Sequence, residues 1–186
     1  NALSSNFQIE VRRDNKINFM EFSQGNVLKS LQIIDQSRVG DLEKIVPKSI
    51  DGTTVTFKPD PEIFKEFVIF DKKIILKSLK DRAYLTSKIY FHFYDQRDNT
   101  QKHFYFEGGI ISLIKSLNKK QKVLHPPIYL KGNSEKESIE AEIAIQYNDS
   151  FKENTPSYVN IINTTEGGTH LSGFKAALTR SIKDYA

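Results

Sequence analysis

The segment DKKIILKSLKDRAYLTSKIYFHFYDQRDNTQKHFYF, residues 71–106, contains a helical pattern followed by two β patterns. Apolar residues recur at helical spacing as far as Leu85, and lysines occupy the opposite face, which predicts an amphipathic helix capped by Asp71. Residues 89–94 and 103–106 are rich in aromatic side chains and are joined by a polar loop, which predicts a β-hairpin. We therefore expect an α+β fold with helices covering one face of a mixed sheet.

The predicted hairpin carries aromatic residues on both faces of each strand, between Tyr90 and Phe106. Such residues could form a platform on which nucleic-acid bases stack. Aromatic residues on both faces are more typical of strands packed between a helix layer and a neighbouring strand. We therefore favour a packed hairpin over a base-stacking surface.

The segments before residue 71 have a β pattern. Residues 7–13 and 16–22 flank Asp14-Asn15, a pair that tolerates a tight turn, and this predicts a second hairpin. A polar stretch over 35–51 precedes a β-branched run over 52–57, which ends at two prolines. We place a boundary between subdomains just after them, at about 59–70.

The segments after residue 106 alternate between helix and strand patterns. Apolar spacing predicts a short buried helix from Gly109, and strict alternation predicts a half-buried strand over 139–147. A further strand is expected over 158–162. The final helix has apolar residues at helical spacing, namely Leu171, Phe174, Leu178, Ile182 and Tyr185, and the first four of these should form a buried stripe.

Composition excludes several classes of protein. The 186 residues include no cysteine, which excludes disulfides and thiolate metal sites and favours a cytoplasmic location. No apolar run approaches the roughly 18 residues of a membrane span. The net charge of +4 permits DNA as a partner without identifying it. Neither end carries a start or stop signal, so we expect the chain to be cut from a longer one.

Few residues in the sequence suggest chemistry by themselves. The four histidines lack metal-ligand spacing, so no metal site is expected. Glu166-Gly-Gly-Thr-His170 precedes a helix, where backbone N–H groups could receive a phosphate, although a Gly-Gly pair more often allows a tight bend. The residues alone therefore predict an α+β fragment without a self-sufficient catalytic constellation.

Four stretches, in this order and spacing, resemble the B subunits of bacterial DNA gyrase, a family of type IIA topoisomerases. They are Tyr105-Phe-Glu-Gly-Gly-Ile110, Gln146-Tyr-Asn-Asp-Ser-Phe151, Asn163-Thr-Thr-Glu-Gly-Gly-Thr-His-Leu-Ser-Gly-Phe174 and Ala176-Ala-Leu-Thr-Arg180. The resemblance implies that residues 1–65 form the C-terminal part of a GHKL ATPase domain. Residues 66–186 would be a transducer domain of the ribosomal-protein-like βαβ type, truncated at its C-terminal end.

The resemblance also implies a function. In this family, ATP binding with Mg²⁺ dimerises the B subunits, and the transducer relays the nucleotide state to the DNA-cleaving core formed with the A subunit. The family's general-base glutamate, magnesium-holding asparagine and glycine-rich lid would precede Asn1, and a transducer lysine would follow Ala186, so the chain alone is expected to be inactive. The alternatives are a topoisomerase IV ATPase subunit and a non-catalytic interaction module with the transducer fold.

Site residues are carried over from the family by position. Thr53 and Val55 match the adenine-pocket strand, and Arg13 matches an arginine at the pocket mouth that aminocoumarin inhibitors contact; taken alone, Arg13 would be a solvated hairpin charge. Three cations of the last helix are expected to face the DNA cavity of the dimer, namely Lys175, Arg180 and Lys183. Lys175 stands where gyrases commonly have arginine, so the positive charge is kept and the planar guanidinium is lost. The alternative is that Lys175 is an ordinary exposed lysine of a helix surface.

Overall fold

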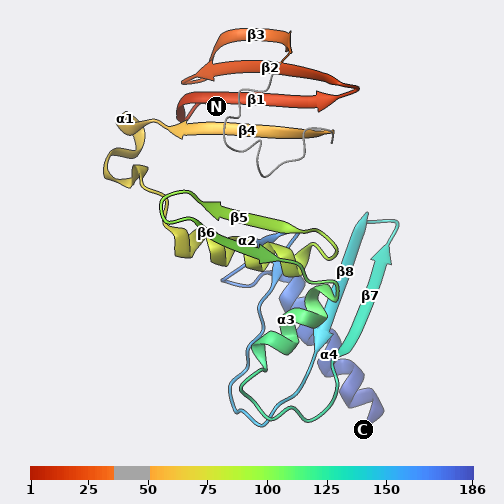
Figure 1. Cartoon of the computed structure of the whole chain (residues 1–186). Coiled ribbons are helices and arrows are strands. Elements are labelled where there is room, and N and C mark those ends of the chain that lie inside the picture. The colour runs from red at the N-terminus through yellow and green to blue at the C-terminus, as the bar shows by residue number, and fades with distance from the viewer. Residues whose placement is uncertain (36–50) are drawn as a thin grey trace. The chain divides into compact units, whose positions relative to one another are not determined.

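The computed structural model describes residues 1–35 and 51–186 of the chain. The chain divides into two compact units, Asn1–Asp71 and Lys72–Ala186. Figure 1 shows the sheet of the first unit and the mixed helices and hairpins of the second. None of the described helices is both long and apolar enough to span a bilayer.

The first unit contains a four-stranded antiparallel sheet with the strand order β3-β2-β1-β4. Its strands are β1 (Ser4–Arg13), β2 (Lys16–Ser23), β3 (Asn26–Ile34) and β4 (Gly52–Pro59). The predicted hairpin is confirmed: Asp14 and Asn15 form its turn with φ angles of 51° and 57°. The left-handed conformation that such a turn requires is one that Asn and Asp tolerate.

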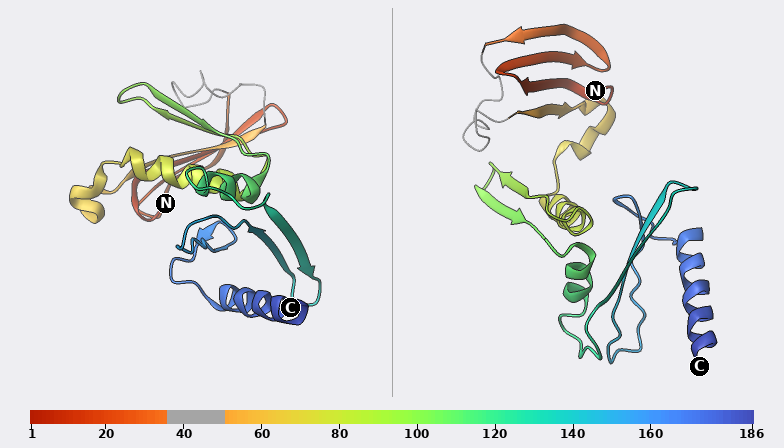
Figure 2. Two further views of the ribbon diagram at one scale, coloured as in Figure 1. Left: turned by 90° about the horizontal axis from the view of Figure 1, so that it is seen from below. Right: turned by 90° about the vertical axis from the view of Figure 1, so that its right-hand side faces the viewer.

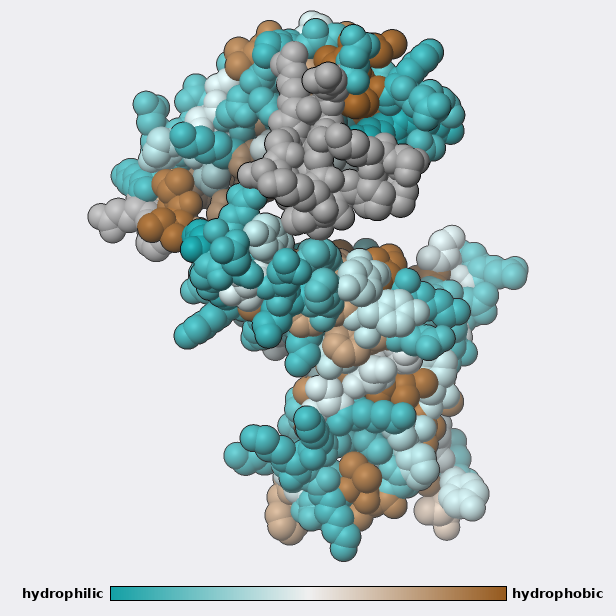
Figure 3. All heavy atoms as spheres, in the orientation of Figure 1, coloured by the Kyte–Doolittle hydropathy of each residue, from teal (hydrophilic) through white to brown (hydrophobic). Residues whose placement is uncertain are grey.

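Strand β3 was not predicted. It follows a turn at Gln24 and Gly25, whose φ angles are 50° and 85°. Most of its apolar side chains are exposed, and Figure 3 shows hydrophobic residues reaching the surface of this unit. The expected polar stretch over 35–51 lies almost wholly outside the described residues.

The two prolines have different roles. Pro59 is the last residue of β4, and Pro61 begins the short helix α1 (Pro61–Phe64), which a 3-10 turn, η2 (Lys65–Val68), follows. Between them, the buried Asp60 caps α1 by accepting a hydrogen bond from the Glu62 backbone N–H at 2.9 Å. Asp60 also accepts one from Gln24 at 2.6 Å, which ties this corner to the β2–β3 turn.

One face of the sheet buries Phe19 completely, together with acidic side chains. Glu21 accepts hydrogen bonds from Asn6 at 2.9 Å and Gln8 at 3.2 Å, and it pairs with Lys29 Nζ at 2.6 Å. These contacts, led by that from Lys29, lower the pKa of Glu21 to about 2. A charged side chain is therefore part of the interior of this unit.

The second unit combines helices with short antiparallel hairpins. Its helices are α2 (Lys72–Leu85), α3 (Gly109–Leu117) and α4 (Thr169–Tyr185). Its paired strands are β5 (Phe91–Asp95) with β6 (Thr100–Phe104), β7 (Ile128–Ser134) with β8 (Ile139–Ile145), and β9 (Tyr158–Val159) with β10 (Ile162–Asn163). The right-hand view in Figure 2 places α3 and α4 on opposite sides of the β7–β8 hairpin.

The α+β prediction is confirmed, and two details of it are wrong. Every ladder among the described residues is antiparallel, so the expected mixed sheet is replaced by separate hairpins. The single strand expected over 158–162 is a tight hairpin, because Asn160 turns the chain with a φ of 55°. Asparagine adopts this conformation more readily than most residues.

The core of the second unit lies where α2 meets the aromatic hairpin and α3. Ala83 and Tyr84 are buried, and the Tyr84 ring stacks on Phe106 with centroids 3.7 Å apart. Gly109 has a φ of 53°, and a Cβ added there would lie 3.5 Å from the Tyr84 carbonyl oxygen. The Gly-Gly pair thus gives a close bend into α3. The hairpin is half-buried, and Tyr90 is exposed, so its aromatic residues are not uniformly packed.

Candidate functional site

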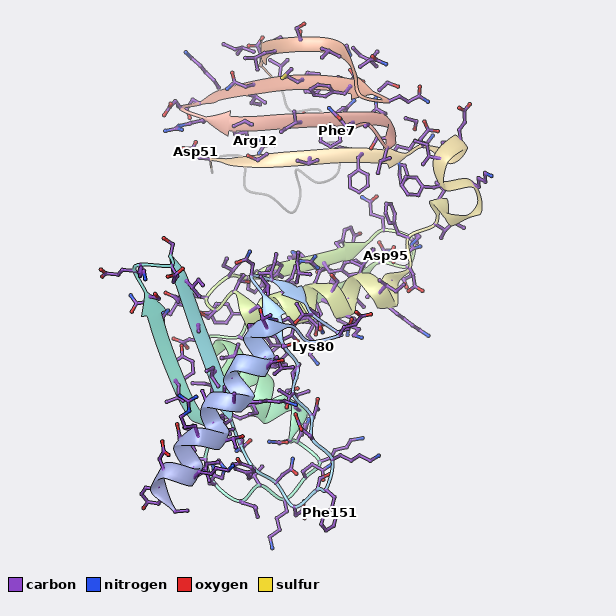
Figure 4. The ribbon with its side chains drawn as sticks, turned by 180° about the vertical axis from the view of Figure 1, so that it is seen from behind. Phe7, Arg12, Asp51, Lys80, Asp95 and Phe151 are labelled. Carbon is purple, nitrogen blue, oxygen red and sulfur yellow. The ribbon has the colours of Figure 1, made fainter. Side chains whose placement is uncertain are left out.

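The register of β1 and β4 places the three predicted pocket residues on one face of the sheet. Val11 pairs with Thr53, and Ile9 pairs with Val55, so these side chains share a face. Arg13 lies two residues beyond Val11 on β1 and therefore belongs to the same face. This strand also carries the labelled Phe7 and Arg12 in Figure 4. The face combines a hydroxyl, apolar groups and a cation at one end.

This face is open in the described structure. Thr53, Val55 and Arg13 are all exposed. The Arg13 guanidinium lies 3.9 Å from the Asp14 carboxylate, and both side chains are largely in water. Such an exposed pair contributes little to stability, so it holds Arg13 only weakly.

A small apolar cavity of about 220 Å³ continues from the same face. It is lined by Leu3, Ser4, Phe57, Pro59, Phe64 and Phe70. Phe57 follows Thr53 and Val55 on β4 at strand spacing, and its ring meets Phe70 edge-to-face at 5.8 Å. The sequence analysis missed this cavity, although the alternation along β4 extends to Phe57.

The predicted DNA-facing cations lie on helix α4. Gly167 and Gly168, with φ angles of 78° and 152°, bend the chain immediately before the helix begins at Thr169. Lys175, Arg180 and Lys183 then fall within an arc of about 140° on the helix. Ala176, Thr179 and Asp184 lie on the same side of the helix as these cations.

Lys175 differs from the other two cations because it is paired. Its Nζ lies 2.7 Å from Glu153 Oε1, and Thr155 donates a hydrogen bond to the same oxygen at 2.9 Å. The hydrogen bond from Lys175 lowers the pKa of Glu153. Among the described carboxylates, none forms an ion pair with Arg180 or Lys183. No local sequence pattern links Glu153 to Lys175, so sequence reasoning missed the pair.

The predicted apolar stripe of α4 is only partly correct. Leu171, Phe174 and Leu178 are half-buried, whereas Ile182 is 55% exposed and Tyr185 is 96% exposed. The periodicity identified the apolar side of the helix. Burial also requires a partner, and no described residue covers the last two turns.

The histidines do not assemble a metal centre in the described structure. His92 and His103 are cross-strand neighbours with ring centroids 4.3 Å apart, and Tyr90 contacts His103. No group of three or more His, Cys, Asp or Glu side chains within residues 1–35 and 51–186 is placed to hold a metal ion.

A model of the DNA gyrase B family matches residues 109–186. The B subunit of DNA gyrase from Streptococcus pyogenes serotype M3 is 41% identical over 189 residues, which cover 100% of this chain and 27% of the relative. Over its whole length the chain resembles DNA gyrase B proteins. The gyrase B protein of Halalkalibacterium halodurans is 39% identical, with 100% and 28% covered.

Solved structures from the gyrase B family share this fold. The 43K ATPase domain of Thermus thermophilus gyrase B, solved in complex with an aminocoumarin, superposes with a TM-score of 0.82 at 32% identity and covers 100% of this chain and 48% of that one. The gyrase B protein of Myxococcus xanthus gives a TM-score of 0.81 at 22% identity, with 95% and 48% covered. The expected GHKL and transducer fold is thereby confirmed. The chain spans about a quarter of the length of its curated gyrase B relatives.

One of the four gyrase-like stretches forms a network of hydrogen bonds with the segment that follows α3. Gln146 and Asn148, from the Gln146–Phe151 stretch, exchange hydrogen bonds with the Asn118 side chain, at 2.9 and 2.7 Å. Asp149 accepts another from the Lys122 backbone N–H at 3.2 Å. The stretch therefore fastens the end of β8 to the connection that leaves α3, and it fixes the start of the loop that carries Glu153.

Proposed function

We propose that this chain is part of a DNA gyrase B protein, in which it couples ATP binding and hydrolysis to DNA strand passage and negative supercoiling. The observation that carries the proposal is the alignment of the whole chain, at 39–41% identity, with gyrase B proteins from distinct bacteria. The activity belongs to the complete ATP-dependent topoisomerase. A topoisomerase IV subunit and a non-catalytic interaction module remain alternatives that no observation favours.

The domain assignment is part of the proposal. Residues 1–65 would close the GHKL ATPase domain, and residues 66–186 would form the transducer domain. The division of the chain into compact units near Asp71 supports an assignment of two domains. In this arrangement the first domain contacts nucleotide and the second passes its state to the DNA gate.

The open face of β1 and β4 would form one edge of the ATP pocket. The Thr53 hydroxyl can exchange hydrogen bonds with the adenine edge, Val55 can pack against the ring, and Arg13 can meet an anionic or polar group at the mouth. Mg²⁺ and the triphosphate would be held by other parts of the complete protein. The 186-residue chain alone would therefore not hydrolyse ATP, and Mg²⁺-ATPase assays of the purified chain test this.

The cationic face of α4 would contact DNA in the cavity of a gyrase B dimer. Lys175, Arg180 and Lys183 can each neutralise a phosphate without reading sequence. The partners would be duplex DNA, the gyrase A protein and a second copy of gyrase B, acting in the cytoplasm.

The complete gyrase B protein containing this chain provides the test. Assembled with gyrase A, it should introduce negative supercoils into relaxed plasmid when ATP and Mg²⁺ are present. Decatenation and relaxation without negative supercoiling would identify topoisomerase IV instead. A complex without ATP-dependent DNA activity would favour the interaction module.

A further inference from the structure

We propose that Glu153 acts as an intramolecular competitor that DNA phosphate must displace before Lys175 can bind the duplex. This inference rests on the proposed DNA contact of α4. It adds a residue, outside the helix, that sets the strength and salt dependence of this contact.

The Glu153 carboxylate lies against the Lys175 ammonium group. Glu153 Oε1 lies 2.7 Å from Lys175 Nζ, the place where a phosphate oxygen would approach this lysine. Thr155 donates to the same oxygen at 2.9 Å, which orients the carboxylate toward the helix. Glu153 therefore occupies the anion position of Lys175 in the absence of DNA.

The loop that carries Glu153 is held by polar contacts. Phe151, two residues before Glu153, is fully exposed and projects outward in Figure 4, so it does not anchor the loop by apolar packing. The loop starts instead at Asn148, whose side chain bonds Asn118 and accepts the Ser150 backbone N–H at 2.9 Å. Polar contacts thus fix the start of the loop at Asn148, and from there the loop brings Glu153 to helix α4.

The ion pair between Lys175 and Glu153 is weak. The side chains of Lys175 and Glu153 are 51% and 64% exposed, so water screens their attraction. Exposed ion pairs are usually worth between 0 and about 1 kcal/mol. A duplex has a far higher density of negative charge than one carboxylate, so it can displace Glu153 at a modest loss of affinity.

Glu153 should affect one of the three cations selectively. Lys175 is the one with a described carboxylate partner, whereas Arg180 and Lys183 have none within the described residues. Neutralising Glu153 should therefore release one additional phosphate contact. The other two contacts should remain as they are.

The experiment uses the complete gyrase B protein containing this chain and a short fluorescein-labelled duplex. Affinity is measured by anisotropy between about 50 and 200 mM salt, where phosphate contacts dominate. Glu153→Gln should bind about 2- to 5-fold tighter than the unmodified protein at low salt. Because binding no longer has to break an ion pair at Lys175, the salt slope should steepen by up to about 0.9.

A double-mutant cycle separates competition from a general charge effect. In a Lys175→Gln background, Glu153→Gln should no longer tighten binding. Glu137→Gln is the matched control, because Glu137 is also an exposed carboxylate near a lysine, 4.0 Å from Lys136, on the β7–β8 turn. It should leave the affinity for DNA within 1.5-fold, about 0.2 kcal/mol.

An equal gain from Glu153→Gln in both backgrounds would overturn the competition, and so would no gain or weaker binding. A lower melting temperature accompanied by weaker binding would assign Glu153 a structural role. If Lys175→Gln alone leaves DNA binding unchanged, the proposed DNA contact itself fails, a result distinct from failure of the competition.

Discussion

The stability of the sheet unit should depend on the charge of Glu21. This carboxylate is buried and receives hydrogen bonds from Asn6, Gln8 and Lys29, which lower its pKa from 4.5 to about 2. A carboxyl with a lowered folded-state pKa stabilises the native state above its unfolded pKa. The stabilisation is lost as the pH falls from about 4.5 toward 2.

The magnitude follows from the shift. The pKa of Glu21 differs by about 2.5 between the unfolded and folded states. At 1.36 kcal/mol per pKa unit, its ionised form can stabilise the folded state by at most about 3 kcal/mol. The Lys29 side chain is 46% exposed, so solvent screens the leading contribution. We expect Glu21→Gln to destabilise the unit by about 1–2 kcal/mol at pH 7, and by much less near pH 3.

The single methionine provides a local measurement. Met20 precedes Glu21 on β2, so its ¹³C-methyl signal during urea unfolding reports this unit alone. Glu62→Gln, an exposed change in the same unit, is the control and should shift stability by less than about 0.5 kcal/mol. If Glu21→Gln lowers the free energy of unfolding equally at pH 7 and pH 3, or by no more than the control does, the charge of Glu21 does not stabilise this unit.

Three further changes test the second unit. Gly109→Ala should destabilise it by about 1–2 kcal/mol in thermal unfolding, because φ is 53° and the new Cβ would lie 3.3 Å from Ser87 Cβ; an unchanged melting temperature would contradict this. Asn118→Ala should cost about 1–2 kcal/mol and speed hydrogen exchange after α3, since two amide partners lose their bonds; unchanged exchange would show that the network is dispensable. In the complete holoenzyme, Lys175→Gln should lower DNA-stimulated ATPase activity more than basal ATPase activity. An equal loss in both activities would show that Lys175 is an ordinary surface lysine.

The elements that sequence reasoning located correctly are those with local signals. Asp14-Asn15 specifies its turn through backbone preference alone, and α2 shows its apolar and lysine faces within 14 residues. Strand β3 was missed because its apolar residues are mostly exposed and its pairing with β2 shifts register twice. The sequence signal that could have indicated β3 was the turn at Gln24-Gly25. This turn leads to a strand only because the following residues can pair with β2.

The candidate sites show the same limit. Strand alternation is enough to place Thr53 and Val55 on one face, but Arg13 joins them only through the pairing of β1 with β4. On α4, helical spacing groups the cations, yet it gives no indication that Lys175 is paired. That pair depends on a loop with no regular structure, whose position is set by contacts far away in sequence.

The amide network explains why a recognisable motif can lie beside a site without belonging to it. The carboxamides of Gln146 and Asn148 both bond to Asn118, and the Gln146 amide N–H donates to the His125 carbonyl oxygen. The Asn148 carboxamide oxygen accepts the Ser150 backbone N–H, so all these groups are used within the protein. Their effect on DNA would pass through the loop that they anchor, because Glu153 reaches Lys175 only if that loop starts from a fixed point. Loosening Asn118 should therefore weaken the Glu153–Lys175 pair and move DNA affinity in the same direction as Glu153→Gln, while Glu153→Gln leaves the network intact.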